Sequence, residues 1–364
     1  MVSGEVAFGV GSLVFDAVGA KDVDQWKEIV QSALDAIPSV RNLSLTTPNI
    51  SIFIDGEVTP YGESVELTPA MGLMTFDVTI PTRLQKQLLF GSSVGDVEEF
   101  NVLTMFSHDH PVTFVVCRGA DNTLRNPAFS LAIVRDFLAN EISKLNDSGI
   151  RIRTIGPSPF HADCYLVQGN GTHKLTDDLT FERAHSPGYD RLTFFYDPEK
   201  TASHEAVGKL VQYAAPEFAV FYSLELDRHM RSNRARLVED LANRVADTYS
   251  KHGVIQYLKR IFSNKRDLLT LRLATLKFKL DSIREQRDAT QKIEELYEER
   301  PPILLRKVLE GKTEDNYAEE VETASRVLEL LDSQHSQEVQ RFVSFCVSLL
   351  GVVVGALLGA LLRK

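Results

Sequence analysis

Residues 342 to 362, FVSFCVSLLGVVVGALLGALL, form a long apolar run without a single charged side chain. At about 1.5 Å per residue this run makes a helix of about 31 Å, which matches the hydrocarbon core of a bilayer. A buried core helix is the alternative interpretation, but such helices are usually shorter and carry a polar stripe. The sequence therefore predicts one transmembrane helix over 342–362.

The N-terminal residues indicate on which side of the membrane the rest of the chain would lie. The first residues, MVSGEVAFGVGSLVFDAVG, contain the acidic Glu5, no basic start and no continuous apolar core, so they do not resemble a signal peptide. We therefore expect residues 1–341 to stay in the cytosol and the terminal helix to act as a tail anchor in a lipid bilayer. A bacterial inner membrane is favoured, with mitochondrial and endoplasmic-reticulum membranes as alternatives.

Small residues recur within the apolar run at steps of four, three, four and four. They are Ser344, Ser348, Gly351, Gly355 and Gly359. On a helix this spacing places them on one face, where small side chains let a second backbone approach closely. The pattern predicts a homo-oligomer assembled through the membrane helix. The alternative is that these glycines merely reflect the high glycine content of membrane helices.

Composition narrows the classes of partner. The chain has 364 residues, 43% of them apolar and 25% charged, with a formal net charge of -10. This acidic balance argues against a nucleic-acid-binding surface. The three cysteines cannot form a disulfide framework, which fits a reducing compartment. These values favour ordinary globular domains on the cytosolic side of a membrane.

Residues 1–200 have the pattern of an α+β domain with a mixed sheet and a few helices. Short runs rich in Val, Ile, Phe and Thr predict strands at 51–54, 64–67, 73–80, 100–106, 112–117, 151–155 and 191–196. Apolar residues at helical spacing predict helices over 23–37 and 128–145. We expect this domain to sense a small ligand or to bind a protein partner.

Residues 203–341 have the pattern of an all-α stalk. Apolar residues at near-heptad spacing form three rows, which begin at Leu226, Phe262 and Tyr317. The first row continues through Met230, Asn233, Leu237, Leu241 and Val245, the second through Leu269, Leu273, Leu276, Leu280 and Ile283, and the third through Val321, Ala324, Leu328, Leu331 and His335.

Breaks between these rows are expected at Gly253, at Pro301 with Pro302, and at Gly311. The rows fit either a bundle of the chain's own three helices or an oligomeric coiled coil. The bundle is favoured, because Arg287 and Thr290 interrupt the second row.

The segment FSHDHP offers the first candidate chemistry. His108, Asp109 and His110 are side chains that bind zinc and similar ions. We expect no cofactor, and a divalent metal at these residues is the alternative. On a strand, however, His108 and His110 share a face from which Asp109 points away. Because Pro111 follows these residues, they more simply indicate a polar turn between two strands.

The segment GPSPFHADC offers a second candidate for chemistry. Its two prolines predict a rigid loop, and His161, Asp163 and Cys164 could supply a base, an acid and a thiol. Sequence neighbours on a strand rarely meet in the geometry that nucleophilic catalysis needs. We assign no catalytic residue, and treat His161 and Asp163 as candidates for a ligand-binding or partner-binding loop, with a purely structural role as the alternative.

Three functions remain open from the sequence. The first is a non-enzymatic sensor and effector that self-associates through its membrane helix, the architecture of membrane-acting antiviral defence proteins in bacteria. The second is a tether or adaptor that presents the α+β domain to a soluble partner. The third is a membrane-bound, metal-dependent hydrolase that would use His108, His110 or His161.

Overall fold

The computed structural model describes residues 5–361, except 60–61, 90–93, 109, 120–123, 146–148, 155–161, 186–189, 251–253, 300–302 and 314–316. The strands are β1 (Val6–Gly11), β2 (Leu13–Ala17), β3 (Val40–Thr46), β4 (Ser51–Thr59), β5 (Gly62–Pro69), β6 (Gly72–Thr79), β7 (Glu99–Ser107), β8 (His110–Cys117), β9 (Ile150–Thr154), β10 (Ala162–Gln168), β11 (His173–Lys174), β12 (Leu179–Ala184) and β13 (Asp190–Tyr196). The helices are α1 (Val23–Asp35), α2 (Thr82–Leu88), α3 (Phe129–Ser143), α4 (Ser203–Ser250), α5 (Val254–Glu299), α6 (Arg306–Thr313) and α7 (Tyr317–Leu361).

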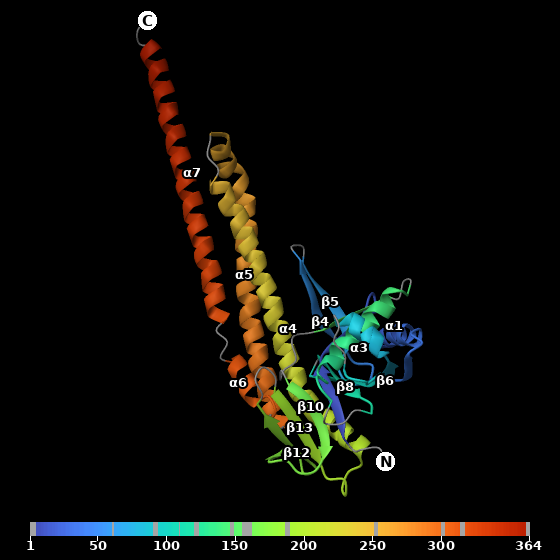
Figure 1. Cartoon of the computed structure of the whole chain (residues 1–364). Coiled ribbons are helices and arrows are strands. Elements are labelled where there is room, and N and C mark those ends of the chain that lie inside the picture. The colour runs from blue at the N-terminus through green and yellow to red at the C-terminus, as the bar shows by residue number, and fades with distance from the viewer. Residues whose placement is uncertain are drawn as a thin grey trace. The chain divides into compact units, whose positions relative to one another are not determined.

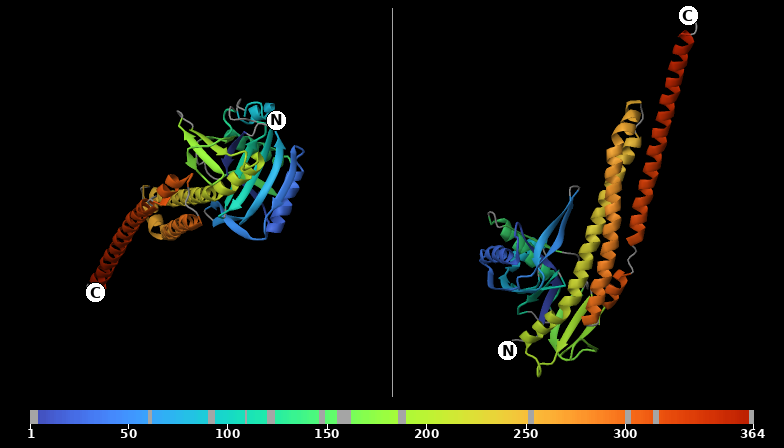
Figure 2. Two further views of the ribbon diagram at one scale, coloured as in Figure 1. Left: turned by 90° about the horizontal axis from the view of Figure 1, so that it is seen from below. Right: turned by 180° about the vertical axis from the view of Figure 1, so that it is seen from behind.

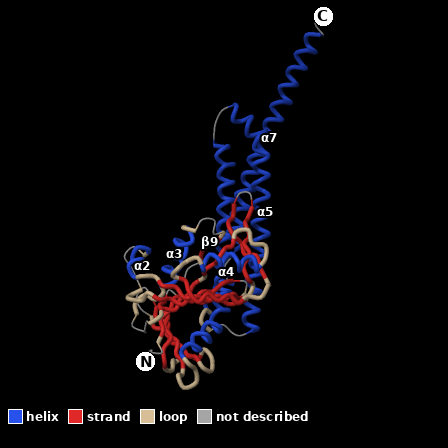
Figure 3. Tube along the Cα trace, turned by 90° about the vertical axis from the view of Figure 1, so that its right-hand side faces the viewer, coloured by secondary structure: helices blue, strands red, loops and turns tan. Residues whose placement is uncertain are grey.

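Nine strands form one mixed sheet in the order β11-β12-β13-β10-β1-β8-β7-β6-β3 (Figure 1). Every neighbouring pair in this sheet is antiparallel except β10 and β13, which run parallel. Two smaller ladders, β2 with β9 and β4 with β5, complete the described strands. Figure 3 separates the strands from the helices by colour.

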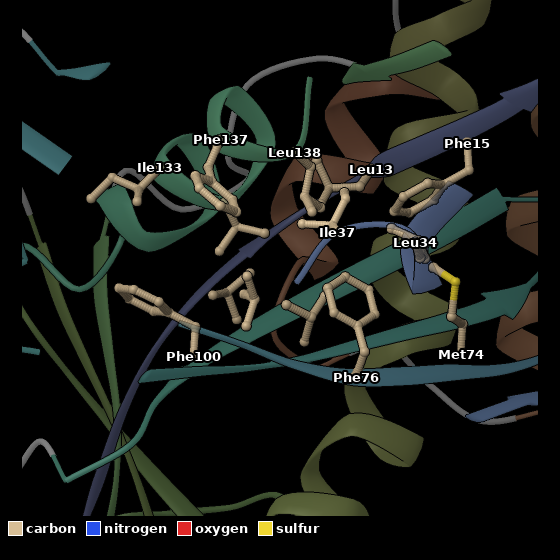
Figure 4. Close-up of a cluster of buried hydrophobic side chains, with 14 of the residues drawn as sticks. Leu13, Phe15, Leu34, Ile37, Met74, Phe76, Phe100, Ile133, Phe137 and Leu138 are labelled. Atoms are coloured by element: carbon tan, nitrogen blue, oxygen red, sulfur yellow. The ribbon is translucent and has the colours of Figure 1, made fainter. Parts of the chain in front are cut away.

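The main hydrophobic core lies between one face of this sheet and the helices α1 and α3 (Figure 4). Side chains alternate along a strand, so one face of β8 contributes Val115 and Cys117 to the core. Trp26 of α1 is fully buried there, and its indole Nε1 donates to the carbonyl of Phe15 at 2.8 Å. Asp22 caps α1 by accepting the N–H of Gln25 at 2.9 Å, which fixes where the helix begins.

Helix α3 packs unusually close to the central strand β1. A Cβ added at Gly9 would lie 2.6 Å from the hydroxyl of Ser130, closer than such atoms approach one another in proteins. Glycine at this position of β1 therefore permits the contact. The opposite face of the sheet is covered by the first half of α4, where Phe114 of β8 and Phe218 have ring centroids 5.9 Å apart.

The chain divides into two compact units. The first comprises residues 1–228 and 289–313, and the second comprises 229–288 and 314–364, so α4 and α5 each contribute to both. In the second unit α4 and α5 lie side by side (Figure 2), joined by the ion pair of Arg234 and Glu285. Parts of α4, α5 and α7 enclose a separate apolar cluster in this unit, which includes Val238, Leu271 and Leu331.

The predicted fold class is confirmed, because a mixed sheet with helices is followed by long helices and by a C-terminal apolar helix. All seven predicted strands and both helices predicted within residues 1–200 are present. Gly253, Pro301 and Pro302, where breaks were expected, lie outside the described residues. Six of the described strands, β1, β2, β3, β10, β11 and β12, and the short helix α2 were not predicted. The expected break at Gly311 is wrong, since α6 continues through that residue to Thr313.

The predicted helical bundle is also confirmed, but one of its predicted rows is wrong. The third row packs in the bundle as expected, with Leu331 buried and Val321, Ala324 and Leu328 against the cluster. On α5, by contrast, Leu268, Leu271 and Phe278 are buried instead of the predicted row. Five members of that predicted row, Leu269, Leu273, Leu276, Leu280 and Ile283, are exposed.

Candidate functional site

A cavity of about 830 Å³ opens on the face of the sheet that α4 covers. Four separate parts of the chain line it: the end of β3 with the residues that follow it, the β5–β6 connection with β6, the end of β7, and the first turns of α4. Its apolar wall includes Met71, Leu73, Leu103, Met105 and Val211. A volume of this size is typical of pockets for small organic ligands.

Strand alternation explains why the cavity is apolar. On β7, Phe100, Val102 and Phe106 enter the main core, while Leu103 and Met105 point to the other face and are only half-buried. On the same face Leu73 of β6 is 40% exposed and Met71 is 51% exposed. Helix α4 therefore covers this edge of the sheet incompletely and leaves apolar surface for another molecule.

Polar residues also line this cavity. His108, which lines it, has a φ of 43°, in the left-handed region that residues other than glycine rarely occupy. Gln212 of α4 also lines it. Pro216, four residues later in the helix, has no N–H, so it cannot supply the helical hydrogen bond to the carbonyl of Gln212. A ligand in this cavity would thus find an apolar wall, an imidazole and an amide.

The two histidines of the candidate metal site have different surroundings. In the segment FSHDHP, Ser107 at the end of β7 pairs with His110 at the start of β8, so the two strands form an antiparallel hairpin. His108 in the turn lines the cavity, whereas His110 is 4% exposed and is not among the lining residues. Asp109 lies outside the described residues. In the described part of the chain, no three His, Cys, Asp or Glu side chains are grouped as a metal ion would require.

Asp163, from the second candidate segment, connects β10 to the start of α3. Its carboxylate accepts the N–H of Ala128 at 3.4 Å, just before the first residue of the helix. Burial raises the pKa of Asp163, while the main-chain hydrogen bonds from Ala128 and Asn126 and the charge of Arg191 act in the opposite direction. This contact indicates a structural role. His161 lies outside the described residues.

The buried thiols do not have the properties of nucleophiles. Burial raises the pKa of Cys117 to about 12 and raises that of Cys164 strongly as well. Both thiols therefore stay protonated at neutral pH, and both side chains are at most 3% exposed. Because an unfolded chain would ionise them near pH 9.0, their burial makes the folded state less stable as the pH rises above that value.

The last candidate residues lie on the terminal helix. Ser344, Ser348, Gly351, Gly355 and Gly359 all fall within α7, which runs unbroken from Tyr317 to Leu361. A Cβ added at Gly351 or Gly355 would meet no atom within 4 Å, so the backbone there is open to a close neighbour. The side chains on either side of Gly351 in the sequence are also exposed, Leu350 at 62% and Val352 at 72%.

Comparisons with protein-family models, with curated protein sequences and with solved structures found no match for this chain. The cavity was missed by sequence reasoning, because its wall combines residues around positions 71, 105 and 211 that no local motif connects. Only His108 had been singled out, and for a different chemistry.

Proposed function

We propose that this chain is a single-pass membrane protein whose sheet domain senses a ligand in the cavity and whose membrane helices self-associate in response. One observation carries the membrane assignment. The stretch Val321–Ala356 of α7 contains a membrane-length window with a mean hydropathy of 1.8, none of which is buried within the described structure. Such a helix is long and apolar enough to cross a bilayer.

A cytosolic position of the sheet domain agrees with the state of its cysteines. Cys117 and Cys164 are free thiols inside the core, as proteins of reducing compartments contain. Both lie in the first compact unit. A bacterial inner membrane remains our choice of membrane, and the architecture resembles membrane-acting defence effectors by analogy only.

The cavity supplies the sensing part of the proposal. A small organic molecule with an apolar body and one polar group fits its wall of Met and Leu side chains and its imidazole and amide groups. Methionine side chains adapt to ligands of different shape, because their three rotatable bonds and soft sulfur tolerate many contacts. Binding there would connect the sheet edge to the first turns of α4, the helix that leads into the second unit.

Filling the cavity tests this step. Gly208 lines the cavity on α4, and a Cβ added there meets no atom within 4 Å. Gly208→Leu should occupy part of the cavity without disturbing the helix, since leucine favours helix more than glycine does. We expect the variant to bind the fluorescent apolar dye ANS at least fivefold more weakly than the unchanged chain, as measured by fluorescence titration of the full chain in detergent.

Gly311→Leu is the matched control. Gly311 is also a helical glycine with open space around an added Cβ, but it lies on α6 and does not line the cavity. This control should bind the dye like the unchanged chain. Because all three forms carry the same terminal helix, dye that enters the detergent or binds that helix contributes equally to each titration. Equal binding by Gly208→Leu and Gly311→Leu would contradict the proposal.

Self-association is tested on the small-residue face of α7. Gly355→Leu places a bulky side chain where a second helix would approach, and it should weaken association by about tenfold, or about 1.4 kcal/mol. Energy transfer between donor-labelled and acceptor-labelled full chains in lipid vesicles measures this. Val353→Leu, on the opposite side of the helix, is the control and should leave the transfer unchanged. Unchanged transfer in Gly355→Leu as well would remove the support for this face.

A further inference from the structure

A row of apolar side chains runs along α5 in the second unit without cover from the bundle. Five consecutive members of the row are between 52% and 59% exposed. They are Leu269, Leu273, Leu276, Leu280 and Ile283. Their spacing of four, three, four and three residues is that of the a and d positions of a coiled coil. We call these five residues the α5 stripe.

The α5 stripe is separate from the face of α5 that packs inside the bundle. That inner face is formed by Leu268, Leu271 and Phe278, which are all at most 4% exposed. Helix α5 thus has two apolar faces, of which the bundle uses one. Side chains that are merely scattered on a surface need no explanation, but five at regular heptad spacing form a continuous ridge that fits a helix partner.

The charged side chains beside the stripe are all basic. In heptad terms the e and g positions next to these residues hold Thr270, Arg272, Lys277, Lys279, Arg284 and Gln286. The four basic members are exposed on α5, and Arg272 also reaches Asp332 of α7 at 2.6 Å. Charges at e and g positions decide which helix a coiled-coil face accepts.

This arrangement disfavours pairing of the α5 stripe with its copy in a second chain. In a parallel pair Arg272 would face Lys277 of the other copy, and Lys279 would face Arg284. In an antiparallel pair e positions would face e positions and g positions would face g positions, so basic side chains would again meet basic side chains. Like charges at these positions oppose association.

A lipid surface is also disfavoured as the occupant. A basic amphipathic helix binds a bilayer by lying flat in its interface. Helix α5 instead packs along α7 in the second unit, through Leu331 and the ion pair of Arg272 with Asp332. If α7 enters the bilayer as proposed above, α5 stands along the same direction and the stripe faces sideways into solvent.

We propose that the α5 stripe docks an amphipathic helix of a partner protein that carries leucine or isoleucine at its a and d positions and acidic side chains at its e and g positions. The partner's apolar residues would cover the stripe, and its carboxylates would pair with Lys277, Lys279 and Arg284. This interaction is independent of ligand binding in the cavity.

Two synthetic peptides test the inference against the full chain in nanodiscs of neutral lipid. Both have leucine at every a and d position, one has glutamate and the other lysine at every e and g position. We expect the glutamate peptide to bind at least tenfold more tightly than the lysine peptide, with binding that weakens as salt is raised. Fluorescence anisotropy of the labelled peptides measures this. Equal binding of the two peptides, or binding of neither, would overturn the proposal.

Variants locate the binding. Leu276→Ser should weaken binding of the glutamate peptide about tenfold, whereas Leu330→Ser should not, because Leu330 is 65% exposed on α7 but lies outside the stripe. Lys279→Glu should reduce the preference for the glutamate peptide. All three positions are exposed, so the fold should tolerate the changes. Full binding by Leu276→Ser, or loss of self-association of the full chain in that variant, would contradict the assignment.

Discussion

We expect Glu217→Gln to lower the free energy of unfolding of the first unit by about 3 kcal/mol. Glu217 of α4 is fully buried, and its carboxylate accepts the main-chain N–H groups of Ile303, Leu304 and Leu305, each at 2.9 Å. These residues directly precede α6, whose N-terminus favours a negative charge. Hydrogen bonds to a charged group contribute about 1.5 to 3 kcal/mol each, and breaking a buried charged contact costs about 3 to 5 kcal/mol.

The chain carries a convenient probe for this measurement. Trp26 is its one tryptophan and lies in the core of the first unit. Urea unfolding of the full chain in detergent, followed by Trp26 fluorescence, should show the midpoint of Glu217→Gln at lower urea. Glu199→Gln removes the same charge from an exposed position in the same unit and should change the free energy of unfolding by less than about 0.5 kcal/mol. Equal midpoints for both variants would show that the carboxylate does not hold this segment.

The sequence predicted the parts of the fold that have a clear local pattern. Strands β6 and β7 mostly alternate between buried and more exposed positions, and β8 is buried throughout, so their runs of Val, Phe and Thr identify them. Strand β1 was missed because Gly9 and Gly11 weaken the strand pattern of VAFGVG. The same glycines allow α3 to approach, a tertiary reason that a local reading does not contain.

The candidate sites were harder to predict than the fold. The cavity depends on how far α4 covers the sheet, and its lining combines Gly208 with Met105 and Leu73 although they are distant in sequence. Helix α5 has two apolar rows, and either could form the face that is buried in the bundle. Heptad spacing favoured Leu273 and Leu280, but the bundle buries the neighbouring row with Leu271 and Phe278. Which row is inside depends on the rotation of the helix, which spacing alone does not fix.

Removing residues 342–364 should have the largest effect of any change to this chain. The apolar run contains thirteen Leu, Val and Phe residues. At about 0.3 to 0.6 kcal/mol for each, they favour membrane insertion by about 4 to 8 kcal/mol, and no charged residue in the run opposes them. The remaining chain ends after the part of α7 that packs in the bundle at Leu331, so both compact units should stay folded. A chain ending at Arg341 should therefore be soluble.

Alkaline carbonate extraction tests the membrane assignment most directly. Membranes from bacterial cells that produce the full chain, or the chain ending at Arg341, are washed at high pH, which releases peripheral proteins and retains integral ones. The full chain should stay in the membrane pellet, and the chain ending at Arg341 should be found in the soluble fraction with an unchanged Trp26 emission spectrum. Release of the full chain by carbonate, or retention of the shortened chain in the pellet, would contradict anchoring by α7.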